Sequence, residues 1–409
     1  MDAKSLWKYE DIRSCNYFID LVTQRLKKNE LIGSPTNIKH YLGEIYFFRA
    51  YTYYKKLRAY GDLPLVDEVL KDKFEELIKL SKRTPQNEVA RFIISDLKEA
   101  AGLLLETAPG NGRISKDAAL MLLARVALYE GTWLKYHGGT GLAPGNPKWP
   151  GNKYFPNFAF QAGDITAEAN FFFDEAIKAS EIIADKRPLH KKYQELFSSL
   201  SLAGIPEVIL AKNYSSTVNG HSVSQRLART ADGTGFTRSL IDSYLMEDGL
   251  PYYKSPKFES DTSIITVMAH RDSRLVTSTN IPGQISTINK ATNDTAFVGL
   301  PRITGRSYNS NTPTGYEIAK WRSVDYSQSM TESAGTTASP IFRAAEAYCI
   351  YLEAYYERHN ALGGKCATYW KQLRERAGVN PDFEKTIRET DLSKEIDLGR
   401  YSGTKLVSS

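Results

Sequence analysis

The chain has 409 residues, of which 42% are apolar, 24% charged and 11% aromatic, a composition that excludes a disordered or low-complexity protein. The formal net charge is only +6, which gives no indication of a nucleic-acid-binding protein. Charged residues interrupt every apolar stretch well before the roughly 18 residues that a membrane span needs, so nothing in the sequence predicts a transmembrane segment.

Helical periodicity dominates the N-terminal part of the chain. Between Ser34 and Gly61, apolar and aromatic residues recur every three or four positions, which is the spacing of a helix with one buried face. Ser34-Pro35 supplies the N-cap and a first-turn proline, and Gly61 supplies the end of this helix over 35–61. The same kinds of signal predict three more helices, over 85–106, 116–131 and 168–186.

Two further helices are predicted near the C-terminal end. Ser339-Pro340 repeats the start signal and predicts a helix over 340–359, and Gly363-Gly364 turns the chain into a helix over 365–377. The six helices form three consecutive pairs, with small residues where two helices would cross closely. Repeated helix pairs are typical of a tetratricopeptide-like array, so the sequence predicts a mainly α fold.

Two long segments, 134–164 and 201–338, lack this periodicity. The first is rich in glycine, proline and aromatic residues, and the second contains a stretch in which Ser, Thr, Asn, Gly and Pro dominate. This composition predicts loops with short strands. Long loops within a compact fold are usually functional, so we expect the ligand-binding residues there. The predicted helical scaffold comprises residues 1–133, 165–200 and 339–380.

Familiar catalytic and metal-binding signatures are missing. The chain has no Gly-x-Ser-x-Gly, His-Glu-x-x-His, Cys-x-x-Cys or P-loop motif, and its six histidines are scattered singly. We therefore predict no catalytic residue, no bound metal and no cofactor. The two carboxylates of a glycoside hydrolase can be far apart in the chain, so an all-α carbohydrate-active enzyme stays open as an alternative.

Aromatic and amide side chains in the two long segments have the chemistry of a glycan-binding site. The weakly hydrated C–H faces of sugars pack on Trp and Tyr rings, while amide side chains bind the hydroxyl groups. The prediction depends on the group, because ordinary loop packing would explain each residue taken singly. The predicted ligand contacts are Trp149, Tyr154, Tyr308, Asn309, Asn311 and Tyr326.

Several motifs resemble those of the SusD/RagB family of nutrient-binding proteins from Bacteroidetes. The most specific is GEIYFFRAY at 43–51, followed by GDLPL at 61–65, which is similar to the helix and the Gly-Asp-x-Pro-Leu turn of that family. Within these motifs, Glu44, Arg49 and Asp62 are expected to be structural. Further matches follow in the family's order, among them Arg271-Asp272-x-Arg274, Lys320-Trp321 and Arg343-Ala344-Ala345-Glu346.

The resemblance implies one SusD-like domain over 1–409, with tetratricopeptide-like helix pairs and a large loop-rich insertion containing short strands. It also implies a binding protein of the cell surface, not an enzyme, that captures a glycan or another nutrient. The partner would be a SusC-like TonB-dependent transporter of the outer membrane, facing the helices, while the loops face the ligand.

Family precursors begin with a lipoprotein signal and an acylated cysteine, which this sequence does not contain. The resemblance therefore implies attachment to the outer membrane through an N-terminal lipid anchor that lies outside this sequence, and no other association with a membrane. A tetratricopeptide-type adaptor that binds peptides stays open as a third alternative, for which a concave groove lined by helices would be expected.

Overall fold

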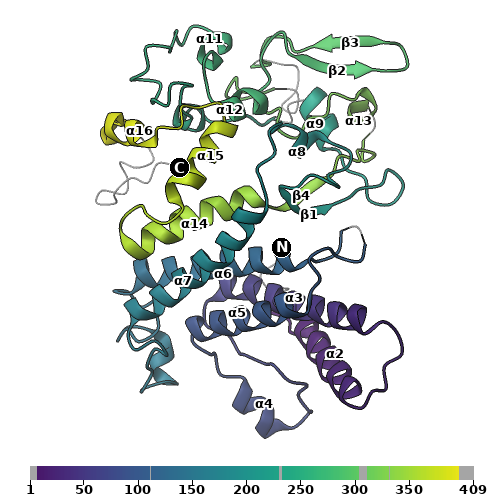
Figure 1. Cartoon of the computed structure of the whole chain (residues 1–409), viewed down its shortest axis with the longest axis vertical. Helices are drawn as coiled ribbons and strands as arrows, with labels where there is room; N and C mark the ends of the chain where they lie inside the picture. Colours follow the sequence, from purple (N-terminus) through teal and green to yellow (C-terminus); the bar gives the residue numbers. More distant parts are fainter. Residues whose placement is uncertain (1–6, 111, 230–232, 304–310, 331, 396–409) are drawn as a thin grey trace. The chain divides into compact units, whose positions relative to one another are not determined.

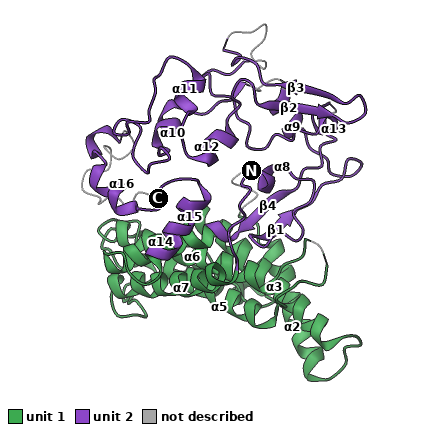
Figure 2. Ribbon diagram, turned by 45° about the horizontal axis from the view of Figure 1, so that its top comes forward, with its two compact units in different colours: residues 1–186, 346–366 green, residues 187–345, 367–409 purple. Residues whose placement is uncertain are grey.

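The computed structural model describes residues 7–110, 112–229, 233–303, 311–330 and 332–395. Its contacts divide the chain into two compact units, which Figure 2 shows in different colours. Unit 1 comprises Met1–Lys186 and Glu346–Cys366, and unit 2 comprises Arg187–Ala345 and Ala367–Ser409. Neither unit is a continuous stretch of chain. The single domain that was expected over 1–409 stays a prediction.

Unit 1 is helical (Figure 1). Ser34 accepts a hydrogen bond from the backbone of Asn37, and Gly61 ends the helix with a positive φ of 67°, so the predicted cap and stop are confirmed. Ser115 caps a second predicted helix, which continues beyond 131 to His137. The helices are α2 (Glu10–Lys27), α3 (Pro35–Tyr60), α4 (Phe74–Leu80), α5 (Gln86–Leu103), α6 (Lys116–His137), the 3-10 helix η1 (Pro150–Lys153), α7 (Ile165–Lys186) and most of α14 (Ala344–His359).

Two of the predicted helix pairs are confirmed in unit 1, since α3 packs against α5 and α6 packs against α7. Each pair meets at a glycine. A Cβ atom added to Gly43 would lie 3.0 Å from the side chain of Leu103. A Cβ atom added to Gly131 would lie 2.7 Å from the Phe173 ring. The absence of a side chain therefore allows these helices to approach closely.

Arg49 and Glu44, on α3, are structural as expected. Arg49 is 5% exposed, and its guanidinium donates hydrogen bonds of 2.7 and 2.8 Å to the carboxylate of Asp96 on α5. It also donates at 2.9 Å to Asn16 on α2, so one side chain joins three helices. Glu44 forms an ion pair with Arg113. Buried charges of this kind are stable only when they are paired.

Helix α14 returns the chain to unit 1 and is held there by polar contacts. Arg125 of α6 donates hydrogen bonds of 2.6 and 2.7 Å to Glu346 at the start of α14. At the other end, the Tyr136 hydroxyl donates to the carboxylate of Glu357 at 2.8 Å. These contacts, with others between α14 and α7, complete the helical bundle of unit 1.

Unit 2 consists of short elements separated by loops, which confirms the expectation of a loop-rich insertion with short strands. Its strands form two antiparallel two-stranded sheets, β1–β4 and β2–β3. In neither unit does a described helix have the length and hydrophobicity needed to cross a membrane. The elements are α8 (Glu195–Ser198), β1 (Val208–Lys212), α9 (Val223–Arg229), α10 (Arg238–Ser243), α11 (Ile264–Met268), α12 (Ser273–Ser278), β2 (Ile285–Asn289), β3 (Asp294–Phe297), α13 (Tyr326–Met330), β4 (Ser339–Arg343), most of α15 (Cys366–Arg376), α16 (Phe383–Glu389) and the 3-10 helix η4 (Leu392–Lys394).

Strand β4 corrects the helix predicted over 340–359, whose first residues are extended. Residues 339–343 pair with β1, with Lys212 opposite Ser339 and Val208 opposite Arg343, and the helix begins only at Ala344. Ser339-Pro340 is therefore part of a strand rather than a helix start. Proline lacks a backbone N–H, but it is tolerated in an edge strand, and both strands of a two-stranded sheet are edges.

Candidate functional site

The aromatic segment 134–164 belongs to unit 1, and Trp149 is its buried anchor. Trp149 is 3% exposed, and its indole Nε1 donates a hydrogen bond of 2.7 Å to Asp62. Its ring packs against Phe155 and Phe158, with centroids 6.3 and 5.4 Å away. A ring enclosed in this way presents no face to a ligand. The structure therefore contradicts the predicted glycan contact at Trp149 and assigns this residue to packing.

A buried polar network holds the same segment in place. Asp62 also accepts a hydrogen bond of 2.8 Å from the backbone of Gln86, whose side chain donates at 2.9 Å to Glu130. Near the end of the segment, the backbone of Ala162 donates at 3.1 Å to Glu168. Glu130 is fully buried, and this burial, helped by the neighbouring carboxylates, raises its pKa to about 8. The network thus stabilises the loop rather than forming an open site.

Tyr154 is the predicted ligand contact of unit 1 that stays accessible. It directly follows η1, and 52% of the residue is exposed. The Lys153 ammonium lies 5.5 Å from the centroid of its ring. An exposed tyrosine ring beside a flexible lysine can present its face to the C–H surface of a sugar.

In unit 2, the structure describes Tyr326 and Asn311. Tyr326 is the first residue of α13 and is 36% exposed. Asn311 is half-buried, and its side-chain oxygen has no hydrogen-bond partner among the described residues. Tyr308 and Asn309 lie outside the described residues. The predicted set is therefore divided between the two units, with Tyr154 in unit 1.

Unit 2 also contains a group of side chains that was not among the predicted contacts. We call Tyr193, Phe197, Lys320, Arg343 and Arg376 the cationic cluster. The Lys320 ammonium lies 4.5 Å from the centroid of the Phe197 ring and 5.7 Å from that of Tyr193. The guanidinium groups approach the same rings, Arg343 at 5.0 Å from Phe197 and Arg376 at 5.3 Å from Tyr193. Three cations thus share two aromatic rings.

One buried carboxylate accompanies these cations. Glu207, which is fully buried, accepts a hydrogen bond of 2.7 Å from Arg343 and two of 3.0 and 3.1 Å from Arg376. Lys320 has no carboxylate partner within the described part of unit 2. The motifs containing Lys320 and Arg343 could be recognised in the sequence. The cluster itself could not be predicted, because Tyr193 lies far from these residues in the chain.

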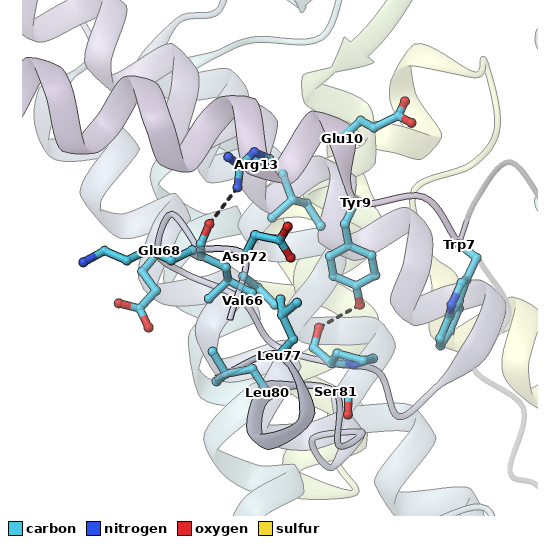
Figure 3. Close-up of a pocket in the computed structure, with 14 residues that line it drawn as sticks. Trp7, Tyr9, Glu10, Arg13, Val66, Glu68, Asp72, Leu77, Leu80 and Ser81 are labelled. Atoms are coloured by element: carbon cyan, nitrogen blue, oxygen red, sulfur yellow. Dashed lines mark hydrogen bonds between the residues drawn. The ribbon is translucent and has the colours of Figure 1, made fainter. Parts of the chain in front are cut away.

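A cavity of about 650 Å³ lies in unit 1, beside the start of α2 and the loop that leads to α4 (Figure 3). Two of its polar side chains are already hydrogen-bonded: the Tyr9 hydroxyl donates to the Pro64 carbonyl at 2.7 Å, and Arg13 donates to the Leu70 carbonyl at 3.0 Å. None of the predicted ligand contacts lines this cavity. Its lining residues are Trp7, Tyr9, Glu10, Ile12, Arg13, Pro64, Val66, Glu68, Leu70, Lys71, Asp72, Leu77, Leu80 and Ser81.

Side chains that could hold a metal ion are not grouped in the part of the chain that the structure describes. His270 has two carboxylate neighbours, with Nδ1 3.3 Å from Glu247 and Nε2 3.8 Å from Glu259. Because the two carboxylates face different ring nitrogens, a single ion could not bind all three side chains. This arrangement is an exposed group of ion pairs.

Two family models match the chain. The model described as the SusD family matches residues 206–397, and a SusD-like model described as starch-binding and associating with the outer membrane matches residues 4–128. Together these matches span well over half of the sequence. The chain belongs to the SusD family. The resemblance based on the motifs at 43–51 and 61–65 is thereby confirmed.

Curated relatives of this SusD-family chain match it over shorter stretches. SusD-like protein P2 of Formosa agariphila is 35% identical over 118 residues, which are 29% of this chain and 23% of that protein. SusD-like protein P25 of the same organism is 27% identical over 135 residues, or 32% of this chain and 24% of that protein. The aligned part is about a quarter of each relative's length.

Several solved structures share the fold, among them that of a SusD-like protein. A SusD-like protein from Bacteroides fragilis has a TM-score of 0.65 at 20% identity, covering 98% of this chain and 73% of that one. A structure solved with a xylogluco-oligosaccharide has a TM-score of 0.59 at 18% identity, with coverages of 97% and 69%. Surface glycan-binding protein A from Bacteroides uniformis has a TM-score of 0.55 at 12% identity, with coverages of 94% and 68%. The predicted mainly α, SusD-like fold is confirmed.

Proposed function

We propose that this protein binds a glycan at the cell surface and does not cleave it. The observation that carries the proposal is the match of residues 4–128 to a family model described as starch-binding and associating with the outer membrane. The structure solved with a xylogluco-oligosaccharide, which shares the fold, supports a carbohydrate ligand for this chain as well. Two exposed tyrosines in the loop-rich segments, Tyr154 and Tyr326, provide aromatic rings on which a sugar can stack.

The proposed contacts act by stacking and hydrogen bonding. Tyr154 and Tyr326 present exposed rings on which sugar C–H faces can pack. Asn311 stays in the proposal for its amide chemistry, although its side-chain oxygen is buried and has no partner among the described residues. Tyr308 and Asn309 stay in the proposal on their chemistry alone, because they lie outside the described residues. Binding of this kind requires no catalytic residue and no cofactor.

The proposed partner is a SusC-like TonB-dependent transporter of the outer membrane, to which the protein delivers the captured oligosaccharide. The outer-membrane association in the matched family description supports this location. Attachment would be through an N-terminal lipid anchor, as the family resemblance implies. We propose that the helices of unit 1 meet the transporter, because the loop-rich segments, of which 134–164 belongs to unit 1 and 201–338 to unit 2, are needed for the ligand.

The test is a panel of polysaccharides examined in two ways. Affinity electrophoresis measures retention of the protein, and a reducing-end assay measures cleavage. We expect retention by at least one polysaccharide without the release of reducing ends. Release would overturn the proposal in favour of a carbohydrate-active enzyme. Retention by none of them, together with binding to an immobilised peptide library, would favour the peptide-binding adaptor.

Variants locate the contacts. Tyr154→Ala and Tyr326→Ala should each weaken retention about two- to tenfold, since an aromatic contact contributes about 0.5–1.5 kcal/mol. Tyr17→Ala is the matched control, because Tyr17 is 59% exposed on α2 and lies outside both loop-rich segments. Unchanged binding in both loop variants would remove Tyr154 and Tyr326 from the proposed site while leaving glycan binding itself in place.

A further inference from the structure

The cationic cluster of unit 2 carries more positive than negative charge. Arg343 and Arg376 share Glu207, and the backbone N–H of His190 also donates to this carboxylate at 2.6 Å. Glu207 therefore has its acceptor positions filled by two guanidinium groups and one amide. The charge of Lys320 is left without a counter-ion within the described residues.

Lys320 has the donors that an anionic ligand requires. An ammonium group carries three N–H donors, and none of them has an acceptor among the described residues. Lys320 is half-buried, with its contacts to the Phe197 and Tyr193 rings holding the ammonium in place. The Lys320 ammonium is thus held by packing and is not neutralised by a carboxylate. Such a cation can form a charge-assisted hydrogen bond with an anion.

Arg376 adds a second free donor to the same cluster. Its side chain is 5% exposed, so water has little access to it. One guanidinium nitrogen, Nη1, is used by Glu207, whereas Nε has no hydrogen-bond partner among the described residues. Buried N–H groups are almost always paired in folded proteins, so this one is left for a water molecule or a ligand.

Tyr244 lies between the cationic cluster and a further cation, Arg274, because it interacts with both Tyr193 and Arg274. Arg274 pairs with Asp272 at 2.6 Å, and its guanidinium lies 5.7 Å from the Tyr244 ring. Tyr244 and Tyr193 are close enough to interact electrostatically and are both half-buried. The Tyr193 ring, which the Lys320 ammonium and the Arg376 guanidinium both approach, provides the combination of an aromatic face and positive charge that suits a charged sugar.

We propose that the cationic cluster binds the acidic group of a glycan, with Lys320 as its main contact. The acidic group is a carboxylate or a sulfate ester, and the sugar ring packs beside Tyr193. This inference rests on the proposed glycan binding and names the class of glycan. A neutral sugar would leave the charge of Lys320 uncompensated, whereas an anion forms a charge-assisted hydrogen bond with it.

The experiment compares three oligosaccharides by calorimetry with the full chain in 50 mM NaCl: an oligogalacturonate with carboxylates only, a sulfated galactan fragment with sulfate esters only, and a neutral xyloglucan fragment. We expect at least one acidic oligosaccharide to bind, and Lys320→Met to weaken it about tenfold. Lys290→Met removes the same charge from the exposed turn between β2 and β3 and should change the affinity less than twofold.

Lys320→Arg provides a variant that retains the charge, and its affinity for the acidic oligosaccharide should stay within about threefold of the natural chain's. Thermal melts of all variants show whether each is folded. The arm that responds identifies the source of the anion: oligogalacturonate alone indicates a uronic acid, and sulfated galactan alone indicates a sulfate ester.

Three results separate failure of the inference from failure of the proposed function. Binding of the neutral fragment alone would overturn the acidic ligand and leave glycan binding intact. Equal weakening of acidic-oligosaccharide binding by Lys320→Met and Lys290→Met would also overturn the assignment of the site to the cationic cluster. The affinity would then depend on the net charge of the protein and not on Lys320. Binding of no glycan, here or in the polysaccharide panel, would overturn both proposals.

Discussion

The indole Nε1 of Trp149 donates a hydrogen bond of 2.7 Å to the carboxylate of Asp62, 87 residues earlier in the chain. Asp62 follows the end of α3, and Trp149 immediately precedes η1. The bond therefore joins the irregular aromatic segment to the helical part of unit 1. A residue whose type suggested ligand binding serves instead to hold a loop in position.

Trp149→Phe should lower the free energy of unfolding by about 1–3 kcal/mol, because it keeps an aromatic ring but leaves the partly buried Asp62 carboxylate without one of its donors. Urea denaturation at pH 7 measures the change. Tyr154→Phe, at a position that is 52% exposed, should stay within about 0.5 kcal/mol of the natural chain. Equal stability of the two variants would contradict the role of this hydrogen bond.

Gly131→Ala should lower the free energy of unfolding by about 1–3 kcal/mol, since the new Cβ would lie 2.7 Å from the Phe173 ring and force α6 and α7 apart. Gly102→Ala on α5 is the control, because nothing lies within 4 Å of its added Cβ. The control should be neutral or stabilising by up to about 1 kcal/mol, since alanine favours a helix. If both substitutions changed the free energy of unfolding in the same direction and by a similar amount, the close contact between α6 and α7 at Gly131 would be refuted.

Glu130 should make stability depend on pH. Its pKa is about 8 in the folded chain and has an ordinary value of 4.5, so between these values the folded state binds a proton that the unfolded state does not. Its contribution is complete below about pH 4.5 and is lost as the pH rises to about 8. Glu130→Gln cannot ionise and should flatten this fall. Urea midpoints at pH 5, 6, 7 and 8.5 provide the comparison, and parallel curves would exclude a titrating Glu130.

Arg49→Met should destabilise unit 1 by about 3–5 kcal/mol, because it leaves the buried Asp96 carboxylate without its main partner. Arg49→Met combined with Asp96→Leu removes both charges and should recover part of the loss. Denaturation of the two single variants and the double variant gives the coupling free energy. Additive losses would show that the pair contributes nothing as a pair.

Local signals explain which parts of the fold the sequence predicted. Helix α3 was predicted over 35–61 and found at Pro35–Tyr60, because its cap, its first-turn proline and its final glycine are all adjacent to it in the chain. Strand β4 was missed because its pairing partner, β1, comes from a distant segment. Pro340 then favoured a helix start only because no local feature indicated the strand.

The site was less predictable, because accessibility and proximity are properties of the folded chain. Loop composition selected both Trp149 and Tyr154, and it could not indicate that the first is 3% exposed and the second 52%. Lys320 was noticed only as part of a motif, since its aromatic neighbours Tyr193 and Phe197 are far away in sequence. That Lys320 has no acidic partner among the described residues can be seen only in the folded chain, where distant segments come together.

The division of the chain has a consequence during protein synthesis. Unit 1 needs Glu346–Cys366, which include most of α14 and its contacts from Glu346 and Glu357. The ribosome makes these residues only after the larger part of unit 2, Arg187–Ala345, has been made. The face of helices α2 to α7 that α14 covers therefore stays exposed while the loop-rich segment is translated. We expect chaperones to bind the nascent chain mainly during this interval.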